Sequence, residues 1–482
     1  MYHISDIKKL LKCERLYHFS KDSGTIFKPY LRSDENIMEL ILKYFDITEY
    51  FEGIRNDSDE KFENSVDKYE WFIHPRFSYD DLRINIPLMR KNEDGFDLFF
   101  IYYGIVIKEL DTLTYKISLD LLEKKAYKIN DIYLVYFNGE YINDGVLDPK
   151  KLFICTNLNK DKRIIDVVRK SNIDFIKIMD SLNKSEIPKD AKKNKYCRLN
   201  GLCEYYHDCF PLEESLPDDS ILTLVSSQNK NKMYEADIEY LKDVDTSLLE
   251  GNRIQYAQIM ASKNGGLFID EYPLRKWLSN LDERPISFID FEWDRYLVPP
   301  YKNMKPMDVL CFEFALYYLD KNGNLEHRTF VGTGDCRKEF IIALLDYLPS
   351  SGPILAYNAI GAECLRIQEL AEMFDEYAEQ LNAINDRFID LFTPFNEGLI
   401  YDIRMQGDFT LKKLVDICSK YSYADLNIDD GLKAVFEWRS IDNKSSDNQD
   451  EVLNNLRQYC SLDAYGLFLV YKWLVELMIE SK

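Results

Sequence analysis

The stretch Pro285-Ile-Ser-Phe-Ile-Asp-Phe-Glu-Trp293 decides the fold expected for the C-terminal part of the chain. Its β-branched and aromatic residues form a short apolar run that is typical of a buried strand. Side chains two residues apart on a strand share a face, so Asp290 and Glu292 should project together. Adjacent carboxylates raise each other's pKa unless a cation lies between them, and a divalent metal is the usual cation. The alternative is a solvated pair of acids at the end of a strand.

Two later segments carry polar side chains that could complete a metal site. Residues 352–358 are predicted to form a short buried strand that ends in an asparagine, and residues 361–374 have helical apolar spacing. Glu363 falls in the first turn of that helix, where the helix dipole favours a carboxylate. Near the C-terminus, a long amphipathic helix carries Tyr459 and Asp463 four residues apart, as neighbours on one surface. Each feature also has an ordinary interpretation, as a helix-capping glutamate or as a Tyr–Asp pair at the edge of a core.

In this order the motifs make residues 285–482 resemble the DnaQ-like 3′–5′ exonucleases of the RNase H-like superfamily, in the DEDD subgroup that carries a tyrosine. The Asp-x-Glu of that family's first strand is matched by Asp290 and Glu292. Its Tyr-x-x-x-Asp on the last helix is matched by Tyr459 and Asp463. The resemblance implies an α/β domain that removes nucleotides from a 3′ end.

The second motif of that family departs from its usual form here. The family places an acid after an asparagine at a strand-to-helix junction, matched by Asn358 and Glu363. It normally has an aspartate at a shorter spacing. A longer side chain on a shifted register could still reach a metal. If it does not, the alternative is a catalytically inactive subunit that binds nucleic acid or assembles a repair, processing or defence complex.

The chemistry of phosphodiester hydrolysis explains the choice of residues. Two Mg²⁺ or Mn²⁺ ions about 3.5–4 Å apart stabilise both the attacking and the leaving oxygen, and such hard cations take oxygen ligands. By the resemblance, the ligands are the four acids of the motifs: Asp290, Glu292, Glu363 and Asp463. A free tyrosine has a pKa of about 10 and is a poor base, so Tyr459 is expected to orient a metal-bound water. Asp390 could also line the groove, or make a structural hydrogen bond to Arg387 or to the backbone.

The remaining pattern of this region agrees with an RNase H-like sheet flanked by helices. Residues 309–319 and 325–331 are predicted strands, joined by a hairpin at Asn322-Gly323. Residues 337–348 and 410–421 are predicted helices. The polar stretch 440–450 is predicted to be a loop before the last helix, where it would act as a flap over the substrate.

Three of the ten cysteines are clustered, with five residues between successive cysteines: Cys197, Cys203 and Cys209. Outside an oxidising compartment, such clusters indicate metal ligation rather than disulfides. Three thiolates leave one ligand missing from a four-cysteine site. Cys13, on a predicted opening helix over residues 5–19 that Ser5 would cap, is the first candidate. Cys155 and His207 are competitors, and reduced cysteines without a metal are the remaining alternative.

One early cysteine and three late ones resemble the iron–sulfur staple of PD-(D/E)XK nucleases, such as the CRISPR-adaptation nucleases and the AddB-type helicase–nuclease subunits. The opening Ser5 to Cys13 resembles those proteins too. The resemblance implies an α/β domain with a [4Fe–4S] cluster, or Zn²⁺ as the alternative. Its ligands would be Cys13, Cys197, Cys203 and Cys209.

The catalytic residues of such a domain are not found at the expected places. The class carries an aspartate on one strand and Glu-x-Lys on the next. The matching strands here are predicted at residues 77–86 and 96–103, which offer Asn85 and Phe100-Ile-Tyr102 instead. Asp80 and Asp81 lie nearby without a companion glutamate and lysine. We therefore expect this domain to keep the fold and the metal staple without hydrolysis.

Composition sets the outer limits of the interpretation. The chain of 482 residues, with 46% hydrophobic and 14% aromatic residues, should fold into two or three globular domains. Its net charge of −22 argues against a broad electrostatic grip on nucleic acid, although not against a local one. There is no signal peptide and no apolar run of membrane-spanning length, so a cytoplasmic protein without a membrane partner is expected.

The predicted architecture has three parts. Residues 1–211 form the degenerate nuclease-like domain, residues 212–283 a helical connector, and residues 284–482 the exonuclease domain. The predicted function is a two-metal 3′–5′ exonuclease acting on single-stranded DNA or RNA. The first domain would serve as a binding platform for nucleic acid or a protein partner. A small-molecule phosphodiesterase is a third possibility.

Overall fold

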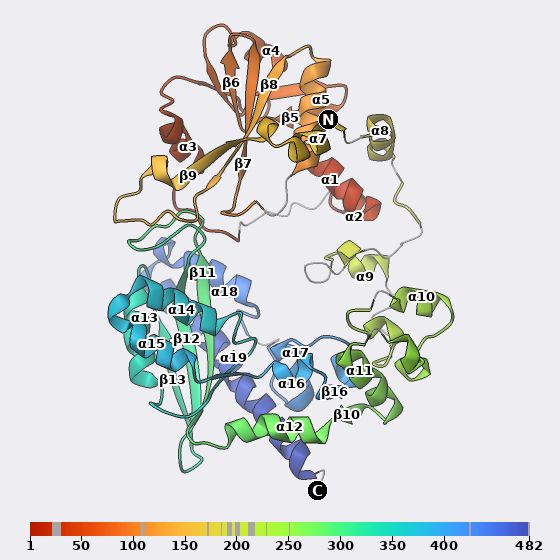
Figure 1. The fold of residues 1–482 in the computed structure, drawn as a ribbon, viewed down its shortest axis with the longest axis vertical. Helices are drawn as coiled ribbons and strands as arrows, with labels where there is room; N and C mark the ends of the chain where they lie inside the picture. Colours follow the sequence, from red (N-terminus) through yellow and green to blue (C-terminus); the bar gives the residue numbers. More distant parts are fainter. Residues whose placement is uncertain are drawn as a thin grey trace. The chain divides into compact units, whose positions relative to one another are not determined.

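The computed structural model shows a mixed α/β protein, as the sequence predicts, and divides into two compact units (Figure 1). It describes residues 1–21, 30–107, 111–170, 173–184, 186–189, 195–197, 203–210, 217–227, 229–249, 251–423 and 426–480. The first unit consists of Met1–Ser215 with Tyr296–Asp308, and the second of Leu216–Arg295 with Val309–Lys482. The expected domain boundary at residues 211 and 212 lies outside the described residues.

Two sheets form the framework of the first unit. The larger one has the order β2-β3-β6-β7-β8-β9, and the smaller one the order β1-β5-β4. The larger sheet contains β2 (Phe51–Glu52), β3 (Trp71–Ile73), β6 (Leu88–Asn92), β7 (Gly95–Tyr102), β8 (Ile129–Phe137) and β9 (Phe153–Asn157). The smaller contains β1 (Tyr2–His3), β4 (Arg76–Tyr79) and β5 (Leu82–Asn85). Strands β6 and β7 form an antiparallel hairpin, and a crossover through α5 (Thr112–Lys124) makes β8 parallel to β7.

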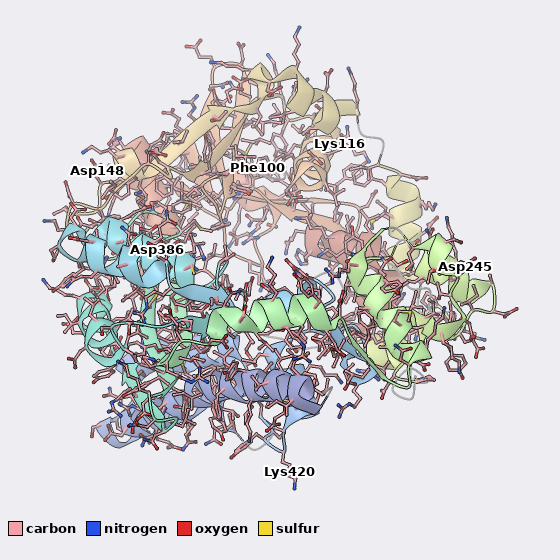
Figure 2. All side chains as sticks on the ribbon, turned by 60° about the horizontal axis from the view of Figure 1, so that its bottom comes forward. Phe100, Lys116, Asp148, Asp245, Asp386 and Lys420 are labelled. Carbon is pink, nitrogen blue, oxygen red and sulfur yellow. The ribbon has the colours of Figure 1, made fainter. Side chains whose placement is uncertain are left out.

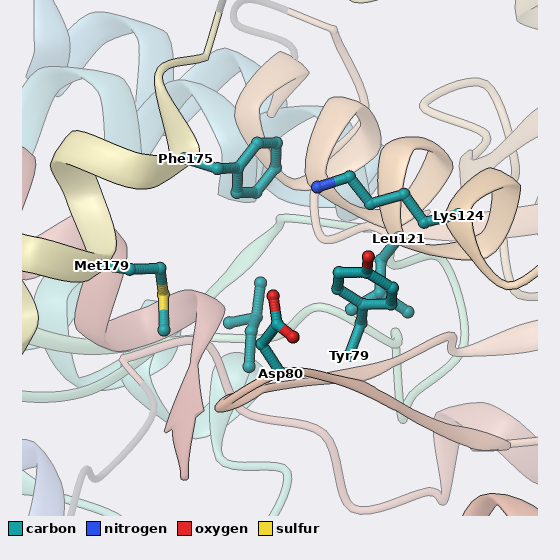
Figure 3. A pocket seen from close by; sticks show the side chains of 7 residues that line it. Tyr79, Asp80, Leu121, Lys124, Phe175 and Met179 are labelled. Atoms are coloured by element: carbon teal, nitrogen blue, oxygen red, sulfur yellow. The ribbon is translucent and has the colours of Figure 1, made fainter.

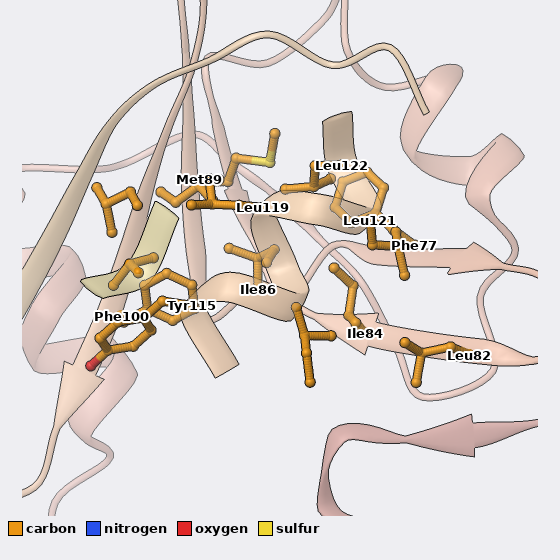
Figure 4. Packing of buried hydrophobic residues seen from close by; sticks show 14 of the residues in the cluster. Phe77, Leu82, Ile84, Ile86, Met89, Phe100, Tyr115, Leu119, Leu121 and Leu122 are labelled. Carbon is orange, nitrogen blue, oxygen red and sulfur yellow. The ribbon is translucent and has the colours of Figure 1, made fainter. Parts of the chain in front are cut away.

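One buried cluster of the first unit lies between α5 and both sheets, as Figure 4 shows. Phe77 and Ile84 of the smaller sheet and Phe100 of β7 pack in one buried cluster with Tyr115 and Leu122 of α5. The other helices are α1 (Ile4–Lys12), α2 (Glu14–Phe19), α3 (Ile37–Phe45), α4 (Asp59–Glu63), α6 (Pro149–Leu152), α7 (Lys162–Lys170), α8 (Phe175–Asn183) and α9 (Tyr206–Cys209). The segment 296–308 joins this unit through backbone contacts of Asn143 with Asn303 and Met304.

Two local predictions for the first unit were wrong. Residues 77–86 are not one strand, because the chain turns at Asp80, which has a φ of 50°, and returns as β5. Asn85 therefore lies in the smaller sheet, whereas Phe100 and Tyr102 lie on β7 of the larger sheet, beside β6. The residues compared with the nuclease motif are not on neighbouring strands.

The opening helix also differs from the prediction. It is interrupted at Cys13, whose extended backbone separates α1 from α2. The first helix begins at Ile4, so Ser5 lies inside its first turn and does not cap it. The backbone N–H of His3 donates instead to the carboxylate of Asp6, at 2.8 Å.

A five-stranded sheet of order β13-β12-β11-β14-β15 organises the second unit. It contains β11 (Ile286–Arg295), β12 (Val309–Leu319), β13 (Leu325–Val331), β14 (Ile354–Ala356) and β15 (Phe388–Asp390). The first three strands are antiparallel, and β11, β14 and β15 are parallel. The predicted hairpin of β12 and β13 is confirmed.

Alternation along β11 assigns its two faces. Ile289 and Phe291 pack in the core with α13 (Arg337–Tyr347) and α14 (Glu363–Met373), which lie with α15 (Ala378–Asn385) on one side of the sheet (Figure 1). Phe288 faces the other way, and its ring lies 5.6 Å from that of Phe468 on α19 (Ser446–Glu480). Asp290 and Glu292 share the face of Phe288, so they project toward α19.

The second unit also contains further helices and a two-stranded sheet. The helices are α10 (Lys230–Glu235), α11 (Arg253–Lys263), α12 (Glu271–Leu278), α16 (Thr393–Asn396), α17 (Leu411–Cys418) and α18 (Gly431–Arg439), and β10 (Leu267–Ile269) pairs with β16 (Ile400–Asp402). The predicted loop 440–450 is wrong beyond residue 445, because α19 already begins at Ser446. No helix within the described ranges is long and apolar enough to cross a membrane.

Candidate metal centre

Three carboxylates meet between β11 and α19. Asp290, Glu292 and Asp463 each place one oxygen within 4.8 Å of the others. In the part of the chain that the structure describes, this is the one group of three histidine, cysteine or acidic residues with such spacing. Glu292 and Asp463 are only 9% and 7% exposed. The first and third sequence motifs, more than 160 residues apart, therefore meet at a single place.

Burial and mutual repulsion define the electrostatics of this cluster. Burial raises the pKa of Asp290 well above its ordinary value, and the charges of Asp463 and Glu292 raise it further. Burial does the same to the pKa of Glu292, reinforced by Asp463 and by Glu313. Groups of this kind must take up protons or be neutralised by a bound cation. The next acid on β11, Asp294, differs because it forms a salt bridge with Arg439 at 2.5 Å.

Two tyrosines and a lysine border Asp463. The hydroxyl of Tyr423 donates to Oδ1 of Asp463 at 2.6 Å. Burial raises the pKa of Asp463, and hydrogen bonds from Tyr423 and Tyr459 partly offset that rise. The Nζ atom of Lys412 lies 5.1 Å from the ring centre of Tyr423 and 5.3 Å from that of Tyr459. Burial raises the pKa of Tyr459, so its hydroxyl is a neutral hydrogen-bond donor near pH 7.

Glu363 lies beside the cluster but outside the group of three. It is the first residue of α14 and is 2% exposed. The backbone N–H of Phe291, between the two acids of β11, donates to its carboxylate, while burial raises its pKa to about 8. Its charge in turn raises the pKa of Asp290 and Glu292. Glu363 is therefore an electrostatic neighbour of the cluster.

The turn after β14 fixes the position of Glu363. Asn358 has a φ of 57°, a left-handed conformation that asparagine tolerates better than most residues. Its carbonyl oxygen accepts the backbone N–H groups of Gly361 and Ala362, at 3.0 and 3.1 Å. This turn occupies the four residues that separate Asn358 from Glu363, so the longer spacing of the second motif is a local feature of the fold.

Asp390 has the predicted structural hydrogen bond to the backbone. Its Oδ1 accepts the N–H of Phe392 at 2.9 Å. Arg387 donates instead to the carbonyl oxygens of Gly352 and Pro349, so the bond considered between Asp390 and Arg387 is not formed. The charge of Asp390 nevertheless raises the pKa of Glu363, which places it near the cluster.

Sequence reasoning missed three residues of this site: Lys412, Tyr423 and Glu313. Lys412 and Tyr423 belong to no motif. Lys412 lies on the helix predicted at residues 410–421, but nothing in the sequence indicates that this segment approaches Asp463. Glu313, in contrast, does give a signal in the sequence. It is a single acid within the apolar run of β12, and it is fully buried. An isolated carboxylate in a buried strand is costly enough to indicate a function.

An aromatic cleft lies in the second unit on the other side of α19. Its volume is about 680 Å³, within the range of ligand sites. Tyr317 stacks on His327 at 4.2 Å, and Tyr465 packs against both Tyr317 and Tyr421. Arg457 contributes a cation to the lining. Helix α19 thus has carboxylates on one flank and an aromatic cleft on the other.

Cys13 and Cys203 both act on Cys209, another of the four predicted cluster cysteines in the first unit. Burial raises the pKa of Cys209, and the thiols of Cys13 and Cys203 raise it further. The backbone N–H of Cys203 donates to the carbonyl oxygen of Cys197 at 2.9 Å, and Arg15 donates to Sγ of Cys209 at 3.2 Å. The loop 198–202 lies outside the described residues.

The competing cysteine has a different environment. Cys155 lies on β9, where burial raises its pKa to about 11 and Arg90 lowers it slightly. It packs against a hydrophobic cluster of the first unit. His207 lies on α9, close in sequence to Cys209. The electrostatic effects on Cys209 therefore favour Cys13 over Cys155 as the early member of the group.

A cavity in the first unit is too small to be a substrate site. Figure 3 shows Asp80, Lys124 and Phe175 among its lining side chains. Its volume is about 40 Å³, far below the range of roughly 300–1,000 Å³ that is typical of ligand pockets. The Nζ atom of Lys124 lies 5.0 and 4.8 Å from the ring centres of Tyr79 and Phe175, which explains its position. The cavity beside Asp80 is therefore no substrate site.

Comparison with known proteins shows a similarity to a protein family. Residues 287–410 match a family model described as Domain of unknown function (DUF2779). The match includes Asp290, Glu292 and Glu363 and ends before Asp463. No curated protein and no solved structure matches the chain.

Proposed function

We propose that the second unit is a metal-dependent 3′–5′ exonuclease that hydrolyses the phosphodiester bonds of single-stranded DNA or RNA. The observation that carries this proposal is the meeting of Asp290, Glu292 and Asp463 within 4.8 Å. These residues come from the first and last motifs of the DnaQ-like resemblance. The strand order β13-β12-β11-β14-β15 also supports an RNase H-like fold, because the strand with the paired acids is central.

The residues present fit Mg²⁺ or Mn²⁺. Such ions prefer carboxylate oxygens, and a bound cation would neutralise the charge of the three clustered acids. Asp290, Glu292 and Asp463 would hold the metal, with Glu363 beside them. A bound ion of this kind supplies Lewis-acid stabilisation and a more acidic water. Tyr423 and Tyr459 fix the orientation of Asp463, and the neutral hydroxyl of Tyr459 would orient the attacking water.

The aromatic cleft supports a single-stranded substrate. Bases of a single strand stack on aromatic side chains without regard to sequence, whereas paired bases do not expose their faces. Tyr317, Tyr421 and Tyr465 offer such rings, and Arg457 offers a cation for a phosphate. This local arrangement would bind a strand although the net charge of −22 argues against a broad electrostatic attraction to nucleic acid.

The test uses oligonucleotides labelled at either end. With Mg²⁺ or Mn²⁺, the protein should shorten a 5′-labelled single strand progressively and release labelled mononucleotide at once from a 3′-labelled strand. The variant Asp290→Ala/Glu292→Ala should do neither. Unchanged degradation by the variant would identify a contaminant. Turnover of dinucleotides without any action on longer strands would instead indicate a small-molecule phosphodiesterase.

One observation favours the inactive alternative. Glu363 lies outside the group of three acids, and the backbone of Phe291 already occupies part of its carboxylate. A subunit that binds nucleic acid or assembles a complex without cleaving it would retain the aromatic cleft. If the wild-type protein binds a labelled single strand but does not degrade it in the presence of metal, the inactive function is supported.

For the first unit we propose a degenerate PD-(D/E)XK-like domain with a [4Fe–4S] cluster, acting as a binding platform. The ligands would be Cys13, Cys197, Cys203 and Cys209. The effects of Cys13 and Cys203 on the pKa of Cys209 support a shared site. Anaerobically purified protein should be brown, with broad visible absorbance that Cys13→Ser removes. A colourless protein that contains zinc would reject iron.

A further inference from the structure

Glu313 has no hydrogen-bond partner although it is fully buried. Its exposed fraction is 0%, and neither carboxylate oxygen contacts a donor among the described residues. It lies directly across the sheet from Glu292 in the pairing of β11 with β12. Side chains opposite one another in an antiparallel pair have Cβ atoms about 4.5–5.5 Å apart. Two carboxylates are therefore adjacent at the edge of the acidic cluster.

A β-bulge turns Glu313 toward the cluster. The register of β11 and β12 shifts after Glu292, so that Trp293 pairs with Cys311 and Phe312 is the extra residue. Before the bulge Cys311 packs in the core beside α13 and α14, and after it Phe314 packs in the same core. Without the extra residue, Glu313 would point into that core with Cys311. With it, Glu313 faces α19 and the acids.

The neighbouring cation does not neutralise Glu313. Arg457 lowers the pKa of Glu313, but burial and the charge of Asp463 raise it. The guanidinium of Arg457 donates to Asn454 at 3.2 Å and lines the aromatic cleft. A buried carboxylate without a partner is strongly unfavourable unless it binds a proton or a cation. Glu292, which lies next to Glu313, likewise needs a proton or a cation.

We propose that Glu313 and Glu292 form a second divalent-cation position beside the group of Asp290, Glu292 and Asp463. Glu292 is the residue common to both positions, because it is adjacent to Asp463 on one side and opposite Glu313 on the other. This inference rests on the proposed metal-dependent function. It adds a ligand that belongs to none of the three sequence motifs.

The experiment is a titration with Mn²⁺ of the full-length protein, from which divalent cations have been removed. Binding is monitored by calorimetry and by the electron paramagnetic resonance signal of free Mn²⁺. The wild-type protein should bind two ions in the second unit, and Glu313→Gln should bind one. Glutamine keeps the shape and can donate a hydrogen bond to Glu292, so a merely shared proton would be preserved. Glu339→Gln, on the exposed face of α13, is the matched control and should bind two ions.

The outcomes separate this inference from the exonuclease proposal. Two ions in Glu313→Gln, or a single ion in the wild-type protein, would overturn the second position. Two ions in the wild-type protein without any oligonucleotide degradation would overturn the exonuclease and leave the position intact. If Glu313→Gln does not fold by circular dichroism, Glu313→Asp replaces it. This shorter acid should weaken the second ion only, and unaltered binding of both ions would again contradict the proposal.

Discussion

At the scale of single residues, the site depends on carboxylates whose burial is unfavourable without a cation. Asp290 and Asp463 come from different elements and have oxygens within the spacing of one metal ion's ligands. An amide has nearly the same shape as a carboxylate but no negative charge. Substitution by asparagine therefore tests the charge while the packing is kept.

We expect Asp290→Asn and Asp463→Asn each to lower the rate of single-strand degradation by more than about 100-fold. Loss of an outer partner of a metal ligand already costs about 10–100-fold, and these residues are proposed as ligands themselves. Above about pH 8, where these carboxyl groups lose their protons, the same variants should be more stable than the wild-type protein in the absence of metal, because each removes one repelling buried charge. Rates on labelled oligonucleotides and melting temperatures with a chelator check both effects. Asp386→Asn, an exposed position labelled in Figure 2, should change neither.

Tyr423 allows a finer test at the same scale. Its hydroxyl donates to Asp463 at 2.6 Å, and it was not found from the sequence. A hydrogen bond to a charged group contributes about 1.5–3 kcal/mol, so Tyr423→Phe should lower kcat by about tenfold or more through misorientation of Asp463. KM for the oligonucleotide should stay unchanged, because the ring is retained. An equal rise in KM would show that Tyr423 contacts the substrate instead.

At the scale of elements, the motifs correctly brought Asp290, Glu292 and Asp463 together, whereas side-chain orientations that depend on pairing between strands were not predicted. Period-two alternation placed Asp290 and Glu292 on one face of β11, and four-residue spacing placed Tyr459 beside Asp463 on α19. The position of Glu313 beside the acidic cluster was not predicted, because its orientation depends on a one-residue bulge in the pairing with another strand. The strand expected at 77–86 failed because the sequence pattern does not show that Asp80 adopts a left-handed turn.

The aromatic cleft provides an element-scale prediction for substrate binding. Tyr421→Ala and Tyr465→Ala should each weaken binding of a single-stranded oligonucleotide by about 1–3 kcal/mol, the contribution of one stacked base. Binding is measured by fluorescence anisotropy with Asp290→Asn as the background, so that the strand is not degraded. Tyr272→Ala is the matched control, since Tyr272 is 79% exposed on α12 and outside the cleft. Equal affinities for all variants would show that the cleft does not bind the oligonucleotide.

At the scale of the whole molecule, the acidity of the chain and the proposed metal binding are linked to stability. The net charge is −22, and exposed acids such as Asp245 and Asp386 extend over the second unit (Figure 2). Burial raises the pKa of Glu363 from 4.5 to about 8, and it raises the pKa of the three clustered acids in the same direction. Such groups hold their protons more tightly in the folded state than in the unfolded chain. Their stabilising effect is therefore complete below about pH 4.5 and is lost as the pH rises through about 8.

This linkage predicts opposite trends with and without metal. The metal-free protein should lose stability between about pH 6 and pH 8.5, whereas the rise in melting temperature caused by Mg²⁺ should be larger at pH 8.5, where fewer protons compete for the carboxylates. Four of the five tryptophans lie in the second unit, so fluorescence of the Trp71→Phe variant follows its unfolding alone. Glu363→Gln should flatten the metal-free trend, which separates the buried acids from general surface repulsion. An Mg²⁺ effect of the same size at both pH values would mean that the metal binds away from these carboxylates.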